Sequence, residues 1–132
     1  MKRLAVTLIA SLCLTTAIAE TGWVEIASDD DSTWHIKAGS LEFGKTKGGT
    51  SIASVIGRIS NSKTSQVALR KWYVSAVDCK KKMGKVVTLD ISGEYKFEND
   101  FVEGAGTIAT AMAEAICGAV YYKIKEKDSK SL

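Results

Sequence analysis

Most of the chain alternates between apolar and polar residues in short runs, as β-strands do. Residues 33–37 (TWHIK) put Trp34 and Ile36 on one face, so we expect these two side chains to face the core and His35 to face solvent. Further β-prone runs occupy residues 23–28, 41–46, 50–60 and 85–91. Turns are predicted at the acidic run 29–32, at the glycines of 47–49, at the polar segment 61–66 and at 92–94.

The longest strand is predicted over residues 67–79. Both of its faces carry apolar side chains, which is typical of a central strand. Trp72 takes the face opposite Cys79 and lies close to Arg70, so we expect it to be exposed. Since exposed aromatic and arginine side chains often anchor protein interfaces, Trp72, Arg70 and Tyr73 are the candidate binding residues.

The period then changes from that of a strand to that of a helix. From residue 106 to residue 120 apolar side chains recur at helical spacing, and Thr107 is placed to cap the first turn. Strands followed by a single helix predict an α+β domain, in which an antiparallel sheet carries a C-terminal helix on one face. An all-β barrel with the terminal helix outside it is the alternative. Tyr95, Phe97 and Phe101 form an aromatic stretch to which we assign no regular element.

The first nineteen residues are typical of a secretory signal peptide. Basic Lys2 and Arg3 precede a short apolar run, and Ala17-Ile18-Ala19 predicts cleavage between Ala19 and Glu20. The apolar run is shorter than the roughly 20 residues of a membrane-spanning helix. Cys13 follows Leu12 rather than the small residue that precedes a lipidated cysteine, so we interpret it as part of the leader. We expect a single domain over residues 20–122 and a charged flexible tail over 123–132.

Removal of the leader leaves two cysteines, Cys79 and Cys117, which predict a disulfide in an exported domain. Cys117 lies on the apolar stripe of the predicted helix, so a bond to Cys79 would tether that helix to the sheet. In the chain-entropy model, closing the loop between the two cysteines stabilises the folded state by roughly 4 kcal/mol. The alternative is a pair of free or metal-binding thiols. A zinc site would lack ligands, because His35 is the only histidine.

Charge and side-chain chemistry narrow the possible functions. The net charge is +3 and falls to about +1 without Lys2 and Arg3, which gives no indication of nucleic-acid binding. Glycoside hydrolysis would require a carboxylate pair, but the acidic residues are scattered. These are Asp78, Asp90, Glu94, Glu98, Asp100 and Glu103. We therefore expect no enzyme activity, no metal, no cofactor and no stable membrane span after cleavage.

Several short segments resemble the surface-adhesin protein E family of small exported bacterial proteins. They are Gly22-Trp23-Val24, Trp34-His35-Ile36, Ala38-Gly39-Ser40, Asp78-Cys79 and Ile116-Cys117. The resemblance implies an antiparallel sheet with a C-terminal helix tethered by a disulfide to its concave face. It also implies an adhesin that binds host matrix or serum proteins.

The expected function is therefore non-catalytic binding of a protein partner through the sheet face or the loops. The protein would act in the periplasm, at the cell surface or in the medium. The alternative is a periplasmic inhibitor or immunity protein whose partner is an envelope-acting hydrolase. The sequence leaves the oligomeric state open.

Overall fold

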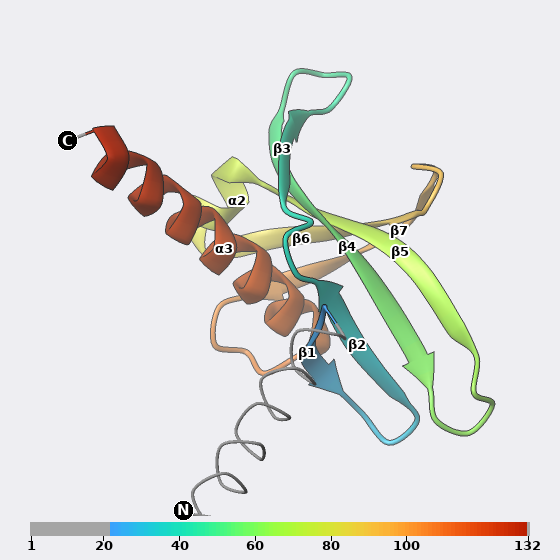
Figure 1. Cartoon of the computed structure of the whole chain (residues 1–132). Coiled ribbons are helices and arrows are strands. Elements are labelled where there is room, and N and C mark those ends of the chain that lie inside the picture. The colour runs from blue at the N-terminus through green and yellow to red at the C-terminus, as the bar shows by residue number, and fades with distance from the viewer. Residues whose placement is uncertain (1–21, 132) are drawn as a thin grey trace, which may run out of the picture.

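The structure, a computed structural model, describes residues 22–131 of the chain. The predicted leader, its cleavage site at Ala19 and Glu20, and Cys13 lie outside the described residues. The elements are β1 (Trp23–Ser28), β2 (Ser32–Lys37), β3 (Glu42–Lys45), β4 (Ser51–Asn61), β5 (Val67–Ser75), α2 (Ala76–Lys81), β6 (Met83–Asp90), β7 (Tyr95–Val102) and α3 (Ile108–Ser131) (Figure 1).

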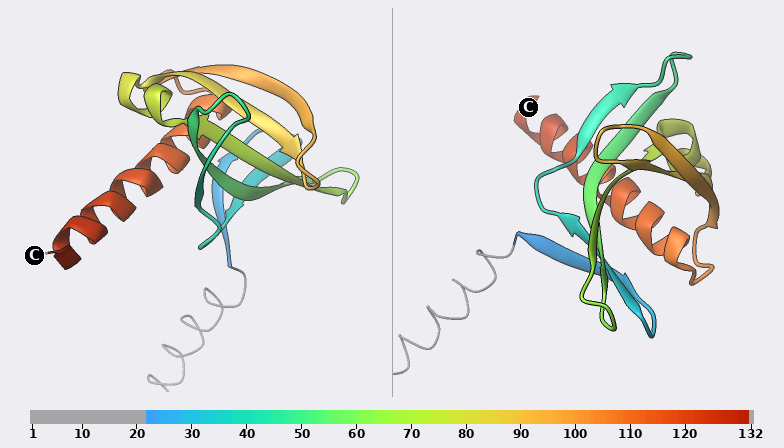
Figure 2. Two further views of the ribbon diagram at one scale, coloured as in Figure 1. Left: turned by 90° about the horizontal axis from the view of Figure 1, so that it is seen from above. Right: turned by 90° about the vertical axis from the view of Figure 1, so that its right-hand side faces the viewer.

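The strands form one antiparallel sheet in the order β1-β2-β4-β5-β6-β7, with β3 paired to the first part of β4. The sheet curves around α3, which contacts both edge strands, β1 and β7, as well as the inner strands (Figure 2). This arrangement confirms the predicted α+β class. The alternative with the helix outside an all-β fold is wrong, because α3 supplies part of the core.

The predicted turns are present and are closed by local hydrogen bonds. Oδ1 of Asp29 accepts from the backbone N–H groups of Asp31 and Ser32 at 2.9 and 2.7 Å, so the acidic run makes the β1–β2 turn. The N–H of Gly49, whose φ is +86°, donates to the carbonyl oxygen of Thr46 in the β3–β4 hairpin. In the β4–β5 turn, Oδ1 of Asn61 accepts from the backbone N–H groups of Lys63 and Thr64.

The core lies between α3 and the inner strands. The residues facing α3 alternate along each strand, and Trp34 and Ile36 of β2 pack against this core as predicted. Its buried side chains are Ala53 and Val55 of β4, Trp72 and Val74 of β5, Cys79 of α2, Val86 of β6, Phe101 of β7, and Met112, Ala113 and Ile116 of α3. One apolar stripe of the helix therefore closes the concave face.

The strand predicted over residues 67–79 is shorter than expected, because β5 ends at Ser75. The Ser75 hydroxyl accepts from the N–H of Asp78 at 3.1 Å and caps α2, so the strand period stops there. Cys79 lies in this short helix rather than on a strand. The helix packs closely on β6, where a Cβ at Gly84 would overlap the carboxyl group of Asp78.

A disulfide joins Cys79 of α2 to Cys117 of α3, with the two Cα atoms 5.5 Å apart. This confirms the pairing inferred from the cysteine count. The helix itself does not end near Val120 as predicted, but continues to Ser131, so most of the segment expected to be a charged tail is helical.

Replacing either cysteine tests how much the tether contributes. Because the bond closes a loop of 38 residues, Cys79→Ser should lower the free energy of unfolding by about 4 kcal/mol. The measurement is urea denaturation of the variant and of the unmodified protein, each with and without a reductant. The reductant should destabilise the unmodified protein and leave Cys79→Ser unchanged. Equal stability of the two oxidised proteins would contradict the prediction.

Candidate functional site

A groove of about 470 Å³ opens between the concave face of the sheet and the first turns of α3. Large apolar side chains line it, among them Trp34, Ile59, Trp72, Phe97 and Met112. The other lining residues are Val86, Thr88, Asn99, Asp100, Thr107, Ile108 and Ala109. An apolar groove with a few polar groups at its margin is the usual form of a ligand or peptide site.

Strand register brings the sheet side of the groove together from five strands. Trp72 of β5 pairs with Thr88 of β6, which pairs with Phe97 of β7. On the other half of the sheet, Trp34 of β2 pairs with Ile59 of β4. Directly paired residues point to the same side of a sheet, so both rows project from the concave face.

The helix side of the groove is formed by the first turns of α3, which hydrogen bonds hold in position. Oγ1 of Thr107 accepts from the N–H of Thr110 at 3.1 Å, which confirms the predicted cap. The buried hydroxyl of Thr110 donates to the carbonyl oxygen of Val102 at the end of β7, at 2.9 Å. Gly104 and Gly106 have φ values of +81° and +76° and make the turn between the two elements. The helix start is therefore bonded to the strand that carries Phe97.

The expectation that Trp72 is exposed is wrong. Its exposed fraction is 1%, and it lies on the concave face among the core residues. The prediction assumed that strand alternation continues to Cys79 and so puts Cys79 and Trp72 on opposite faces. Since α2 interrupts that alternation, both side chains join the same core.

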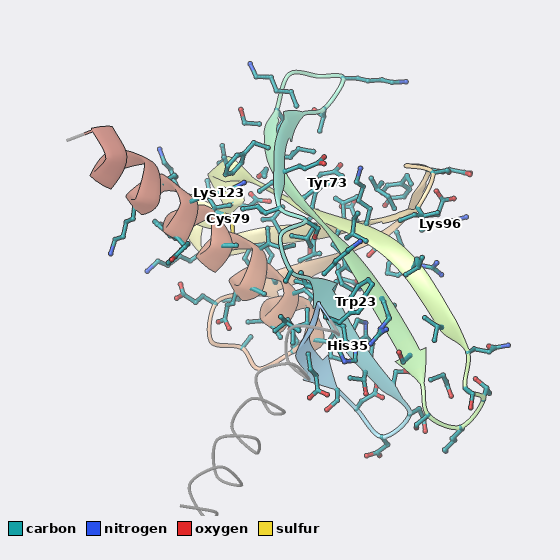
Figure 3. All side chains as sticks on the ribbon, viewed as in Figure 1. Trp23, His35, Tyr73, Cys79, Lys96 and Lys123 are labelled. Carbon is teal, nitrogen blue, oxygen red and sulfur yellow. A yellow bond between two sulfur atoms is a disulfide. The ribbon has the colours of Figure 1, made fainter. Side chains whose placement is uncertain are left out.

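The three predicted binding residues do not form one site. Arg70 and Trp72 have the same parity in β5, and the Arg70 guanidinium donates to the carbonyl oxygen of Leu69 at 3.0 Å. Tyr73 lies on the opposite, convex face and is half-buried (Figure 3). Of the three, Trp72 alone lines the groove, as its floor rather than as an exposed anchor.

Trp72 can lie this deep because β4 has no side chain beneath it. A Cβ at Gly57 would overlap the six-membered ring of Trp72. The indole therefore packs directly against the backbone of β4, and the depth of the groove depends on this contact.

A charged cluster lies on β6 and β7, on the convex face opposite the groove, where Lys85 pairs with Asp100. Nζ of Lys85 is 2.7 Å from Oδ1 of Asp100 and 3.4 Å from Oε2 of Glu98. The hydrogen bond to Asp100, followed by that to Glu98, raises the pKa of Lys85. Desolvation, followed by the hydrogen bond to Glu98, raises the pKa of Tyr95. Lys85 and Tyr95 thus keep their protons at neutral pH and hold the two carboxylates in place.

Asp78, Asp90 and Glu103, three of the other carboxylates considered for acid–base chemistry, have structural contacts. Asp90 accepts from Ser92 and Glu94 in the β6–β7 turn, and the Ser92 hydroxyl lowers the pKa of Asp90. Asp78 accepts from the N–H of Lys85, and Glu103 pairs with Lys82 at 3.7 Å. In the part of the chain that the structure describes, no three His, Cys, Asp or Glu side chains form a group that could hold a metal ion.

His35 is half-buried on the convex face, whereas the sequence predicted an exposed side chain. It pairs with Arg58 of β4, whose guanidinium lies over the ring of Trp23 at 4.7 Å from the centroid. Within the described residues, Nδ1 of His35 and Nε of Arg58 are buried without a hydrogen-bond partner. Figure 3 shows Trp23 and His35 on the same part of the sheet. These residues form a second polar and aromatic cluster, on the face away from the groove.

The sequence analysis missed the groove and the role of Phe97. The signal for Phe97 was present: Phe97 and Phe101 are four residues apart, so both lie on the concave face of β7. The other walls come from elements far apart in the chain, and their meeting depends on the register and curvature of the sheet.

No protein-family model, curated protein or solved structure matches this chain. None of the helices in the described part of the chain is both long enough and apolar enough to cross a membrane.

A pair of glycine variants tests the packing that forms the groove floor. Gly57→Ala should lower the free energy of unfolding by about 1–3 kcal/mol, because the added methyl group forces the Trp72 ring out of position. Gly44→Ala in β3 is the matched control, since a Cβ there meets nothing within 4 Å. Urea denaturation measures both. Equal stability of the two variants would show that Trp72 does not pack on Gly57.

Proposed function

We propose that this chain is an exported, non-catalytic binding module that engages a protein partner through the groove beside the start of α3. The observation that carries the proposal is the groove itself, which is lined by Trp34, Phe97 and Met112 around the buried Trp72. Aromatic and methionine side chains contribute much of the energy at protein interfaces. Phe97 is 49% exposed, so it is free to contact a partner.

Export is supported by two independent features. The first nineteen residues have the basic start, apolar run and small-residue site of a leader. The Cys79–Cys117 disulfide is of the kind that persists in oxidising compartments outside the cytoplasm.

The class of partner that we propose comes from the resemblance to the surface-adhesin protein E family. That resemblance favours a host matrix or serum protein. The polar residues that line the groove, among them Thr88 and Asn99, would add orientation to the apolar contact.

A binding assay with two phenylalanine variants tests the proposal. The protein should bind at least one immobilised matrix or serum protein saturably, and Phe97→Ala should weaken that binding by at least about tenfold. Phe43→Ala is the control, because Phe43 is similarly exposed, at 55%, and lies on β3 away from the groove. Thermal melting checks that both variants fold. Absence of saturable binding contradicts the adhesin-like function, and equal weakening by both variants contradicts the groove.

Localisation distinguishes the two classes of partner. We expect the protein on intact cells to be degraded by added protease, or to be found in the medium, because a host ligand must reach it. If it is instead protected and released with the periplasmic contents, a host partner is contradicted. An envelope hydrolase would then be the partner to seek by co-purification.

A further inference from the structure

Lysine side chains gather where α2, the β3–β4 hairpin and the second half of α3 meet. They are Lys45 and Lys47 of the hairpin, Lys80 to Lys82 at the end of α2, and Lys123 and Lys125 of α3, and all are exposed. We call this region the basic end. In Figure 1 it extends from the end of α3 at the upper left to the β3–β4 hairpin at the top, whereas the acidic β1–β2 turn lies at the bottom.

Two pockets, both lined by Cys79, show that these elements are adjacent. Phe43, Lys45, Ala76, Cys79 and Val120 line one apolar pocket of about 410 Å³ on one side of α3. Lys82, Glu103, Cys117 and Tyr121 line another, of about 310 Å³. Nζ of Lys123 lies 5.8 Å from the centroid of the Phe43 ring.

Few of these charges are neutralised. Among the described side chains, Lys82 is the one member of the group with a carboxylate within 4 Å, namely Glu103. The described acids on or beside these elements are fewer than the seven lysines: they are Glu42, Asp78, Glu103 and Glu114. The basic end therefore carries a net positive charge at neutral pH.

Exposed apolar side chains accompany the lysines. The stripe of α3 that packs on the core through Cys117 and Val120 continues one turn later as Tyr121 and Ile124, where the helix extends beyond the sheet (Figure 2). Tyr121, Tyr122 and Ile124 are 52%, 72% and 50% exposed. Phe43, 55% exposed on β3, adds a further aromatic side chain to the basic end.

We propose that the basic end docks on the surface of an anionic lipid bilayer. Lysines with exposed tyrosine and aliphatic side chains are the combination found on proteins that bind membrane interfaces. The cations here are all lysines, whereas Arg58 and Arg70 lie elsewhere on the sheet. Protein interfaces favour arginine and contain few lysines, so an acidic protein is the less suitable partner.

The geometry also gives the docked protein an orientation. The groove lies at the start of α3 and the basic end at its second half, and a helix of 24 residues is about 36 Å long. A protein held on lipid through the basic end would keep the groove away from the bilayer. Docking thus goes beyond the proposed protein binding and leaves that site free.

Sedimentation with lipid vesicles tests this inference. The full chain should bind vesicles of phosphatidylglycerol and phosphatidylcholine more tightly than vesicles of phosphatidylcholine alone, and added salt should weaken the binding. Each lysine near an anionic surface contributes about fivefold. The double variant Lys80→Glu/Lys81→Glu should therefore lose at least about tenfold in binding to the anionic vesicles. Tyr121→Ser/Tyr122→Ser should also weaken binding, since it removes the aromatic contacts.

Matched control variants distinguish the effect of the basic end on vesicle binding from the effects of net charge and of the leader. Lys63→Glu/Lys96→Glu makes the same change in net charge away from the basic end, in the β4–β5 turn and on β7. Tyr95→Ser removes a tyrosine that is 54% exposed on β7. Both controls should bind vesicles nearly as the unmodified protein does, as should Phe97→Ala. All variants share one N-terminal segment, so its contribution cancels.

Equal binding to neutral and anionic vesicles, equal losses in variants and controls, or no binding to the anionic vesicles would each overturn the inference. Capture of an acidic protein through Lys80 and Lys81, without binding to lipid, would replace the bilayer with a protein partner.

Discussion

The contact between Trp72 and Gly57 determines how the rest of the sheet and helix come together. An indole that packs directly on a neighbouring strand requires a residue without a side chain there, and β4 supplies it at Gly57. Burying such a side chain stabilises a domain by about 3–5 kcal/mol relative to alanine, a large share of the total for a small protein. The same ring closes the floor of the groove, so the core and the candidate site share one residue.

Two further contacts fix α3 over that floor. At its start, the hydroxyl of Thr110 bonds to the end of β7, and nine residues after Ile108 the disulfide joins Cys117 to α2. Between these points the helix contributes Met112, Ala113 and Ile116 to the core. Beyond Val120 it extends past the sheet, which leaves its first half structural and its second half available to other contacts.

Much of the fold could be predicted because it depends on local patterns. Alternation placed Trp34 and Ile36 on the core face, the acidic run predicted a turn, and Thr107 predicted the cap of α3. The end of β5 was missed because the sequence does not distinguish a serine that caps a helix from a serine within a strand. Only the hydrogen bond from the N–H of Asp78 identifies Ser75 as a cap. The end of α3 was missed because lysine and glutamate favour helices as readily as they favour solvated tails.

The candidate sites were harder to predict than the fold, for a physical reason. The groove needs β2, β4, β5, β6, β7 and α3 at fixed spacing, and no local pattern contains that spacing. The lysines of the basic end were visible in the sequence, but they lie in three separate segments. Curvature of the sheet and the path of α2 bring them together.

The second half of α3 is the part of the fold with the least internal support. Short helices without tertiary packing are marginal in water, so this half depends on the first half as its nucleus and on local contacts such as that of Lys123 with Phe43. Its apolar stripe continues in Tyr121 and Ile124 without a covering element among the described residues. A bilayer surface against this stripe would supply the packing that the sheet supplies to Met112 and Ile116. Docking and the stability of the helix end would then be coupled, because binding to the helical form stabilises it.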